Sequence, residues 1–218
     1  MKTCMSIIIL LVLNSFTIAQ DVKTINKTIE IVDEDKILLE LEGDITVKRS
    51  MGNDIELITN FIQKGKVIGY SNKKKRKEEF DIVVERKENS VVISPGKMEA
   101  FGMLGISWYR EEIEHLIYIP ENIDVSIVKE EGDITILNVH FKSLWINNEK
   151  GNTVLIMNEE KIRTLTAATN KGKIYVSDEP VKDFAYNFIG DGDCVVSVIS
   201  NKGKIKLNLK TEFRSRHQ

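Results

Sequence analysis

Short stretches in which apolar and polar residues alternate recur along the chain, and each of them follows a glycine. The residues two and four places after that glycine are apolar, or nearly so, in six copies: Ile45/Val47, Ile134/Ile136, Thr153/Leu155, Ile174/Val176, Cys194/Val196 and Ile205/Leu207. A period of two places both members of each pair on one face of a β-strand. The residue between them varies freely, which predicts that it faces away from the core; these residues are Thr46, Thr135, Val154, Tyr175, Val195 and Lys206.

The segments around these glycines have the composition of turns. The six glycines are Gly43, Gly132, Gly151, Gly172, Gly192 and Gly203, and each is followed by Asp, Asn or Lys. Glycine at such a place adopts a positive φ that a side chain would strain. Apolar residues also lie seven and five places before the glycine in several copies, for example Val125 and Ile127 before Gly132. Each unit therefore reads as a strand, a glycine turn and a second strand.

The spacing of the units predicts how they assemble. From Gly132 the intervals are 19, 21 and 20 residues, followed by a final interval of 11. A period of about twenty residues suits a rung of two short strands and two turns, and the last half-step suits a closing unit. Successive hairpins of a β-sandwich would give a similar pattern. The shared inward phase of the six copies favours an all-β, single-domain β-solenoid.

The regular units occupy residues 121–210, whereas residues 20–120 carry a blurred pattern. Strand-like runs lie at residues 54–62, 80–85, 90–94 and 113–119, joined by longer and less regular segments. Terminal repeats of a solenoid are often atypical because they cap the stack. We therefore expect residues 20–120 to form an irregular β cap within one domain of residues 20–218. A division into two domains near Pro120 is the alternative.

Residues 1–19 are typical of a secretory signal peptide. Lys2 precedes an apolar run at residues 7–13, and the small Ala19 suits cleavage before Gln20. The run is too short to span a bilayer comfortably. We expect a mature chain without a membrane span, exported to the periplasm, the cell surface or the medium; a buried N-terminal element is the alternative. Only Cys194 then remains as a thiol, so the mature chain forms no internal disulfide.

Charge excludes one broad class of partner. The chain has 31 basic and 33 acidic residues, a formal net charge of −2, which argues against a broad electrostatic surface for nucleic acid or anionic lipid. The most basic run, residues 73–77, is followed at once by Glu78 and Glu79. We interpret it as a solvated hairpin loop; an anionic polysaccharide or lipid headgroup is the alternative ligand.

An apolar segment with several glycines, residues 96–109, is too irregular for a predicted strand and is the best candidate for a functional loop. Its aromatic residues could bind a protein or stack on a sugar, since aromatic side chains with a polar group dominate such contacts. The candidate partner-binding residues are Phe101, Trp108 and Tyr109 of this loop, together with the outward Tyr175. The alternative is that the loop covers the open end of the β-stack.

Motifs for catalysis, cofactors or metals are weak. Asp191 and Asp193 lie at a glycine turn but lack the further oxygen ligands of a calcium loop. Cys194 takes the place of an inward aliphatic residue, so we expect a buried, unreactive thiol. The three histidines, His115, His140 and His217, are dispersed and fit no metal motif. We therefore expect no cofactor, no metal and no catalytic set.

A resemblance to a known family rests on the second half of the chain. Residues 117–127, Ile-Tyr-Ile-Pro-Glu-Asn-Ile-Asp-Val-Ser-Ile, precede the unit at Gly132, and the units at Gly151, Gly172 and Gly203 follow. This arrangement resembles the bacterial putative-adhesin family with a toast-rack-like β-solenoid, over roughly residues 113–209, with residues 39–47 as a weaker member. Residues 138–141 lack the glycine that often opens the next rung in that family. The resemblance implies an exported, non-enzymatic, all-β protein of the cell envelope.

The leading hypothesis is a surface or periplasmic binding scaffold that presents a solenoid face to an envelope protein or a glycan. Thr135, Val154, Tyr175 and Val195 would form part of that face. Self-association is a further expectation, because exposed β-edges template pairing. One alternative is a carbohydrate-active enzyme, a lyase or hydrolase that uses paired carboxylates on a β-helix. Another is a purely structural component of the envelope.

Overall fold

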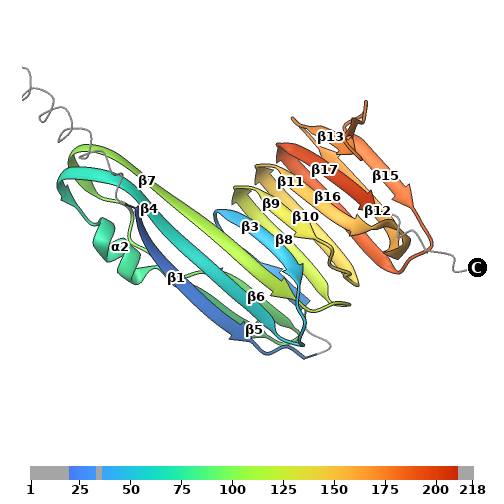
Figure 1. Ribbon diagram of the computed structural model, residues 1–218, viewed down its shortest axis with the longest axis horizontal. Coiled ribbons are helices and arrows are strands. Elements are labelled where there is room, and N and C mark those ends of the chain that lie inside the picture. Colours follow the sequence, from blue (N-terminus) through green and yellow to red (C-terminus); the bar gives the residue numbers. More distant parts are fainter. Residues whose placement is uncertain (1–19, 33–35, 211–218) are drawn as a thin grey trace, which may run out of the picture.

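The computed structural model describes residues 20–32 and 36–210 of the 218-residue chain. The described residues form β-strands, one short α-helix and one 3-10 turn, which confirms the all-β prediction. The strands belong to two mixed sheets, one of nine strands and one of eight. In Figure 1 the paired strands β4 and β7 reach beyond the other strands at one end of the molecule. The predicted signal peptide lies outside the described residues.

The two sheets are named A and B. Sheet A contains, in spatial order, β1 (Gln20–Ile29), β4 (Ile55–Ser71), β7 (Met103–Ile119), β3 (Asp44–Arg49), β9 (Ile134–Leu137), β11 (Thr153–Asn158), β17 (Lys204–Lys210), β13 (Lys173–Val176) and β14 (Glu179–Pro180). Sheet B contains β15 (Ala185–Ile189), β12 (Ile162–Thr169), β16 (Cys194–Lys202), β10 (Ser143–Lys150), β8 (Asp124–Glu131), β2 (Lys36–Leu39), β6 (Ser90–Pro95) and β5 (Ile82–Lys87). The helix is α2 (Lys73–Glu79) and the 3-10 turn is η1 (Glu159–Lys161). Buried side chains of both sheets form one hydrophobic cluster.

Five units have the predicted form of strand, glycine turn and strand. Each leaves sheet B, turns at a glycine and enters sheet A; the pairs are β2/β3, β8/β9, β10/β11, β12/β13 and β16/β17. Neighbouring units pair in parallel and in register, for example Ile134 of β9 beside Ile45 of β3. The predicted inward residues are buried in all six copies except Val176, which is half-buried. The period-two pattern therefore identified the core face.

Gly192 is the exception among the six glycines. It precedes β16, and its N–H donates to the carbonyl of Ile162 at 3.2 Å, at the start of a sheet B strand. Val195 consequently pairs with Ser143 and Thr164 in sheet B. The prediction that Val195 shares a face with Thr135 and its equivalents is wrong. Alternation buries one side of a strand in either sheet, so the pattern does not reveal which sheet the strand joins.

The units do not stack in the order of the sequence. Strands β2 and β3 lie between β6/β7 and β8/β9, and β16 and β17 lie between β10/β11 and β12/β13. The unit at Gly203, which the spacing predicted to close the stack, is therefore an interior unit. Its position satisfies the backbone hydrogen-bonding groups on both edges of β17, which pairs with β11 and β13. The antiparallel strands β14 and β15 lie outermost at that end.

Five glycine turns approach one another more closely than any side chain allows. A Cβ atom added to one glycine would lie impossibly near the carbonyl oxygen of the next: 2.4 Å from Gly43 for Gly132, 2.1 Å from Gly132 for Gly151, 1.9 Å from Gly151 for Gly203, and 1.7 Å from Gly203 for Gly172. The order of these contacts is the spatial order of the units. Glycine is therefore required for the distance between turns as well as for the positive φ of Gly132, Gly151 and Gly203.

At three of the five turns, the side chain of the residue after the glycine links that turn to the next. The Asp44 carboxylate accepts a hydrogen bond from the Asp133 N–H at 2.8 Å, and the Asp133 carboxylate accepts one from the Asn152 N–H at 2.7 Å. The Asn152 amide oxygen accepts one from the Lys204 N–H at 3.1 Å. Asp and Asn have an acceptor at the correct reach, whereas Lys has none. This series of side-chain to backbone hydrogen bonds between turns therefore ends at Lys204.

Two segments of the N-terminal half differ from the prediction. The basic run at residues 73–77, predicted as a hairpin loop, lies in helix α2, where Lys75 and Glu79 form an i,i+4 ion pair at 3.5 Å. The segment predicted as a loop at residues 96–109 becomes strand from Met103 onward, because β7 continues its antiparallel pairing with β4 as far as Ser71. No helix in the described part of the chain has the length and hydrophobicity needed to cross a bilayer.

The closeness of the turns gives a prediction for stability. We expect Gly151→Ala to lower the free energy of unfolding by roughly 3 kcal/mol or more, because the new methyl group strains the backbone and separates adjacent turns. Gly52→Ala is the matched control, since no atom lies within 4 Å of its added Cβ. It should change stability by about 0.5 kcal/mol or less. Denaturant unfolding of both variants checks this, and equal effects would contradict the close-approach account.

Candidate binding surface

The far half of the antiparallel pair β4/β7 exposes a large amount of apolar surface. We call this pair the hairpin, although residues 72–102, which include α2, β5 and β6, connect its two strands. Pairing of β4 with β7 continues to Ser71 and Met103, whereas β1 reaches only to Lys64 on one side and β3 only to Glu114 on the other. Five large side chains there are more than half exposed: Ile68 (62%), Tyr70 (68%), Leu104 (75%), Ile106 (71%) and Trp108 (57%). We call these five residues the hairpin patch.

The hairpin patch lies on one face of the hairpin. Ile68 is directly opposite Ile106, and Tyr70 is opposite Leu104, in an unbroken antiparallel register. Directly opposite residues project to the same side, and so do alternate residues along each strand. Ile117 of β7 is buried in the core and lies an odd number of places from Ile106. The hairpin patch therefore lies on the outer face of sheet A, which points away from sheet B.

Basic residues border the hairpin patch on this face. Lys64 lies opposite Arg110, and Lys66 lies opposite Trp108. Both Lys64 and Arg110 contact the carboxylate of Glu112, Arg110 at 3.2 Å through its Nε. The Lys64 hydrogen bond holds the pKa of Glu112 below its usual value. Three basic residues thus face one acidic residue, and Lys66 has no carboxylate partner within the described residues.

The inner face of the hairpin carries a different set of aromatic contacts. Phe101 and Tyr109 stack with their ring centroids 4.5 Å apart and their planes 15° apart. The Tyr109 hydroxyl donates to Glu111 at 2.6 Å, and Arg76 of α2 donates to both oxygens of the same carboxylate, at 3.0 and 2.5 Å. Burial would raise the pKa of Glu111, but the hydrogen bonds from Arg76 and Tyr109 outweigh it and hold that pKa low. Burial and Glu111 together raise the pKa of Tyr109.

Helix α2 is fastened to this inner face. Gln63 donates to the carbonyl of Lys73 at 2.8 Å, and Lys23 donates to the carbonyl of Phe80 at 2.6 Å. The ring of Phe80 stacks on Phe61, with the centroids 4.5 Å apart. Figure 1 shows α2 beside the hairpin and the neighbouring strand β1. The helix covers the inner face, so the outer face is the one left open at this end of the protein.

The four predicted partner-binding residues fall in three places. Phe101 and Tyr109 lie together on the inner face, where their contacts hold the hairpin to α2. Trp108 points outward and belongs to the hairpin patch. Tyr175 lies on β13, half-buried, five strands from β7 in sheet A. At about 4.8 Å per strand this is about 24 Å across the sheet, so Trp108 and Tyr175 mark distant parts of one face.

Sequence reasoning missed most of the hairpin patch. The run Leu104-Gly-Ile-Ser-Trp108 alternates large apolar residues with small ones, which is a period-two strand pattern. Its glycine favoured a loop prediction, although Gly105 pairs with Gly69 inside the hairpin. Ile68 and Tyr70 follow the same alternation in β4. The runs at residues 66–70 and 104–108 predict two paired strands only when they are considered together.

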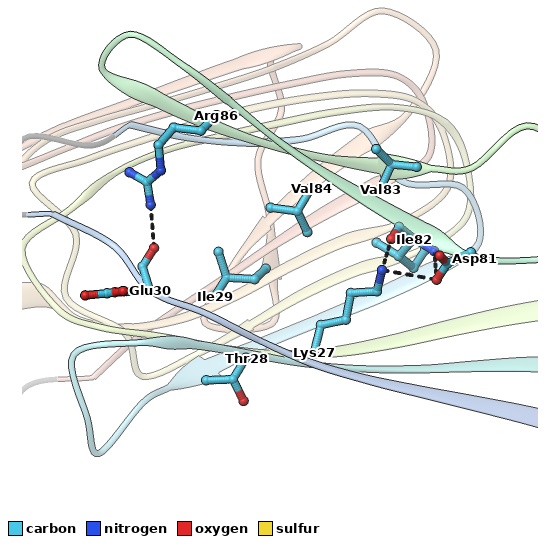
Figure 2. A pocket seen from close by; sticks show the side chains of 9 residues that line it. All are labelled: Lys27, Thr28, Ile29, Glu30, Asp81, Ile82, Val83, Val84 and Arg86. Atoms are coloured by element: carbon cyan, nitrogen blue, oxygen red, sulfur yellow. Dashed lines mark hydrogen bonds and ion pairs between the residues drawn. The ribbon is translucent and has the colours of Figure 1, made fainter.

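A groove of about 650 Å³ lies between the edge strands of the two sheets, β1 and β5. Figure 2 shows Lys27 reaching across it to the carbonyl of Ile82 and to the carboxylate of Asp81, 3.1 Å away, and Arg86 donating to the carbonyl of Glu30 at 2.6 Å. Burial would raise the pKa of Asp81, but the Ile82 N–H and Lys27 outweigh it and lower that pKa. These basic side chains tie the two sheets together, so we assign the groove a structural role.

The shifted carboxyl groups lack the property of a glycosidic general acid. Among the described residues, every carboxyl group whose pKa is clearly shifted is shifted downward by a hydrogen-bonding partner; these are Asp81, Glu99, Glu111, Glu112 and Asp193. A glycosidic general acid needs the opposite shift. Burial raises the pKa of the Cys194 thiol to about 11, as expected for an unreactive core residue. No cluster of three or more metal-ligating side chains occurs within residues 20–32 and 36–210.

Comparisons with known proteins concern the fold. A scan of protein-family models finds no match, and a search of curated proteins finds none. Among solved structures, a putative cell adhesion protein from Clostridium sporogenes has 13% sequence identity and a TM-score of 0.53; the alignment covers 87% of this chain and all of that one. A putative adhesin from Bacteroides fragilis has 12% identity and a TM-score of 0.30, covering 85% and 97% of the two chains. The first similarity shows a shared fold.

The two faces of the hairpin predict opposite roles for neighbouring aromatic residues. Trp108→Ala should change the free energy of unfolding by less than about 1 kcal/mol, because the indole is largely exposed. Tyr109→Ala should lower it by about 2 kcal/mol, because it removes the stack on Phe101 and the hydrogen bond to Glu111. Chemical denaturation of the two variants measures the difference. A larger loss of unfolding free energy for Trp108→Ala than for Tyr109→Ala would contradict the assignment of Tyr109 to the inner face and Trp108 to the outer face.

Proposed function

We propose that this protein is an exported, non-enzymatic binding scaffold of the cell envelope or cell surface. Residues 1–19 act as the signal peptide, and residues 20–218 form one domain whose paired strands serve as the rungs of a solenoid-like stack. The outer face of sheet A contacts an envelope protein or a glycan. Trp108 of the hairpin patch and Tyr175 are the partner-binding residues of this face. Phe101 and Tyr109 contribute by holding the hairpin in place.

The observation that carries this proposal is the character of the outer face of sheet A. One end of it holds the hairpin patch, five exposed apolar side chains in an unbroken register. The rest is a flat row of half-exposed residues in adjacent strands: Leu116, Thr46, Thr135, Val154, Lys206 and Tyr175. Exposed apolar surface of this extent is a feature of interaction sites, and aromatic residues dominate binding energy.

Two further observations support the proposal. The Clostridium sporogenes protein that shares the fold is described as a putative cell adhesion protein, which makes an adhesin-like role a reasonable expectation for this chain. The lowered pKa values of Glu111, Glu112 and the other shifted carboxyl groups favour a binding protein over a carbohydrate-active enzyme, because these groups are held ionised.

Capture of partners by the mature protein tests the proposal. We expect the immobilised protein to retain a defined envelope protein from a membrane-free extract, or to bind a defined sugar on a glycan array. The double variant Trp108→Ala/Tyr175→Ala should reduce recovery of the partner about tenfold or more, since aromatic residues that become buried on binding are frequent hot spots.

Trp145→Ala provides the matched control for that experiment. Trp145 is 39% exposed and lies in β10 of sheet B, on the other side of the molecule. Its removal should leave recovery unchanged. Equal recovery by the double variant and the intact protein would overturn the assignment to sheet A, and capture of nothing by the intact protein would overturn the binding function.

A further inference from the structure

We propose that the hairpin patch docks on an anionic lipid surface. This inference goes beyond the binding scaffold: it adds a lipid surface as a second ligand of the hairpin patch, whereas the stacked part of sheet A around Tyr175 contacts only the protein or glycan partner. The geometry of the hairpin, its size and its charge each bear on the choice of occupant.

The hairpin patch has the composition of a surface that enters the boundary between headgroups and acyl chains. Ile68, Leu104 and Ile106 supply aliphatic side chains that are each more than 60% exposed. Trp108 and Tyr70 supply the amphipathic rings that favour the membrane interface. The hairpin reaches beyond the end of the stack (Figure 1), so a flat surface can meet this patch.

The hairpin patch is long and narrow. It runs beside residues 66–70 of β4, which at 3.4 Å per residue is about 17 Å, and two adjacent strands give a width of about 10 Å. A second copy of this chain would have to align two such narrow strips to cover both. A lipid surface sets no minimum area, since lipid packs around each inserted side chain.

The charges beside the hairpin patch complement an anionic surface. Lys64, Lys66 and Arg110 border it on the same face, with Glu112 between them and Glu114 further along β7. A two-fold pair of patches would bring these basic side chains toward their own copies, which is unfavourable. Anionic headgroups reverse the sign of that interaction and attract basic residues over about a Debye length.

The end of the hairpin carries additional basic residues. Lys73 and Lys74 begin α2 immediately after β4, and Lys97 lies in the segment that leads to β7. The Lys74 side chain is 88% exposed, and its Glu78 contact is long, at 3.9 Å. The contacts of Arg76 with Glu111 hold α2 against the inner face, so these lysines add positive charge to this end of the protein from the side opposite the hairpin patch.

Tryptophan fluorescence with lipid vesicles tests the inference directly. The chain has two tryptophans, so Trp145→Phe leaves Trp108 as the only indole, and Trp108→Phe leaves Trp145. Vesicles of phosphatidylcholine containing an equal part of phosphatidylglycerol should shift the emission of Trp108 to shorter wavelength. Pure phosphatidylcholine should shift it much less, and high salt should weaken the effect. The emission of Trp145, on sheet B, should stay unchanged in all cases.

Substitutions within the hairpin patch give the second measurement. Leu104→Ser/Ile106→Ser should weaken co-sedimentation with the anionic vesicles about tenfold or more, because two exposed aliphatic side chains no longer enter the lipid. Lys66→Glu should weaken it as well. Ile189→Ser is the matched control, since Ile189 is an 84% exposed isoleucine in β15 at the other end of the protein. Circular dichroism confirms that each variant is folded.

The outcomes separate this inference from the proposed function. No vesicle binding by the intact protein, or equal binding to neutral and anionic vesicles, overturns the lipid assignment. A concentration-dependent dimer that Leu104→Ser/Ile106→Ser abolishes, without vesicle binding, overturns it in favour of a second copy of this chain. In either case capture of a partner in the absence of lipid, and its reduction in the single variant Tyr175→Ala, are measured separately, and their persistence leaves the binding scaffold intact.

Discussion

Each glycine turn approaches the carbonyl oxygen of its neighbour so closely that a methyl group could not fit between them. A Cβ on Gly151 would lie 2.1 Å from the Gly132 oxygen. This distance constrains the register of five units in both sheets at once, because each of these five turns joins a strand of sheet B to a strand of sheet A. The Asp44, Asp133 and Asn152 side chains then bridge adjacent turns, and the alternating aliphatic residues meet in a shared core. Local turn chemistry therefore determines the architecture of the stack.

The parallel stack of units ends at the N-terminal half of the chain, and the strands that close it there form the candidate binding surface. Sheet A finishes there in the antiparallel strands β7, β4 and β1. Antiparallel strands can extend beyond the units beside them, as β4 and β7 do beyond Lys64 and Glu114, although residues 72–102 with α2, β5 and β6 connect them. Helix α2 covers the inner side of this extension, through Arg76 and Phe80. The outer side remains apolar and basic, so the binding surface is a consequence of how the stack is closed.

The sequence predicted the local units more reliably than their arrangement. Alternation identified inward residues such as Ile134 and Leu207, and the residues after each glycine indicated turns. The order of units was beyond reach, since the Gly203 unit carries the same pattern whether it closes the stack or lies inside it. The period-two pattern does not show which of the two sheets a strand joins, so the prediction placed Val195 in the wrong sheet. The hairpin patch was missed because Ile68 and Ile106 lie 38 residues apart, and only long-range pairing brings them together.

Disulfide formation between introduced cysteines tests the central claim, that the Gly203 unit lies between its sequence predecessors. Val154 and Lys206 are partners in adjacent strands and both face outward, so Val154→Cys/Lys206→Cys places two thiols about 5 Å apart, within disulfide reach. Tyr175 lies one strand further from Val154, at about 10 Å. Mild oxidation should therefore link the first pair, and Val154→Cys/Tyr175→Cys should stay reduced, as non-reducing peptide mapping would show. A link between residues 154 and 175, with none between 154 and 206, would mean that the units stack in sequence order and would contradict the account.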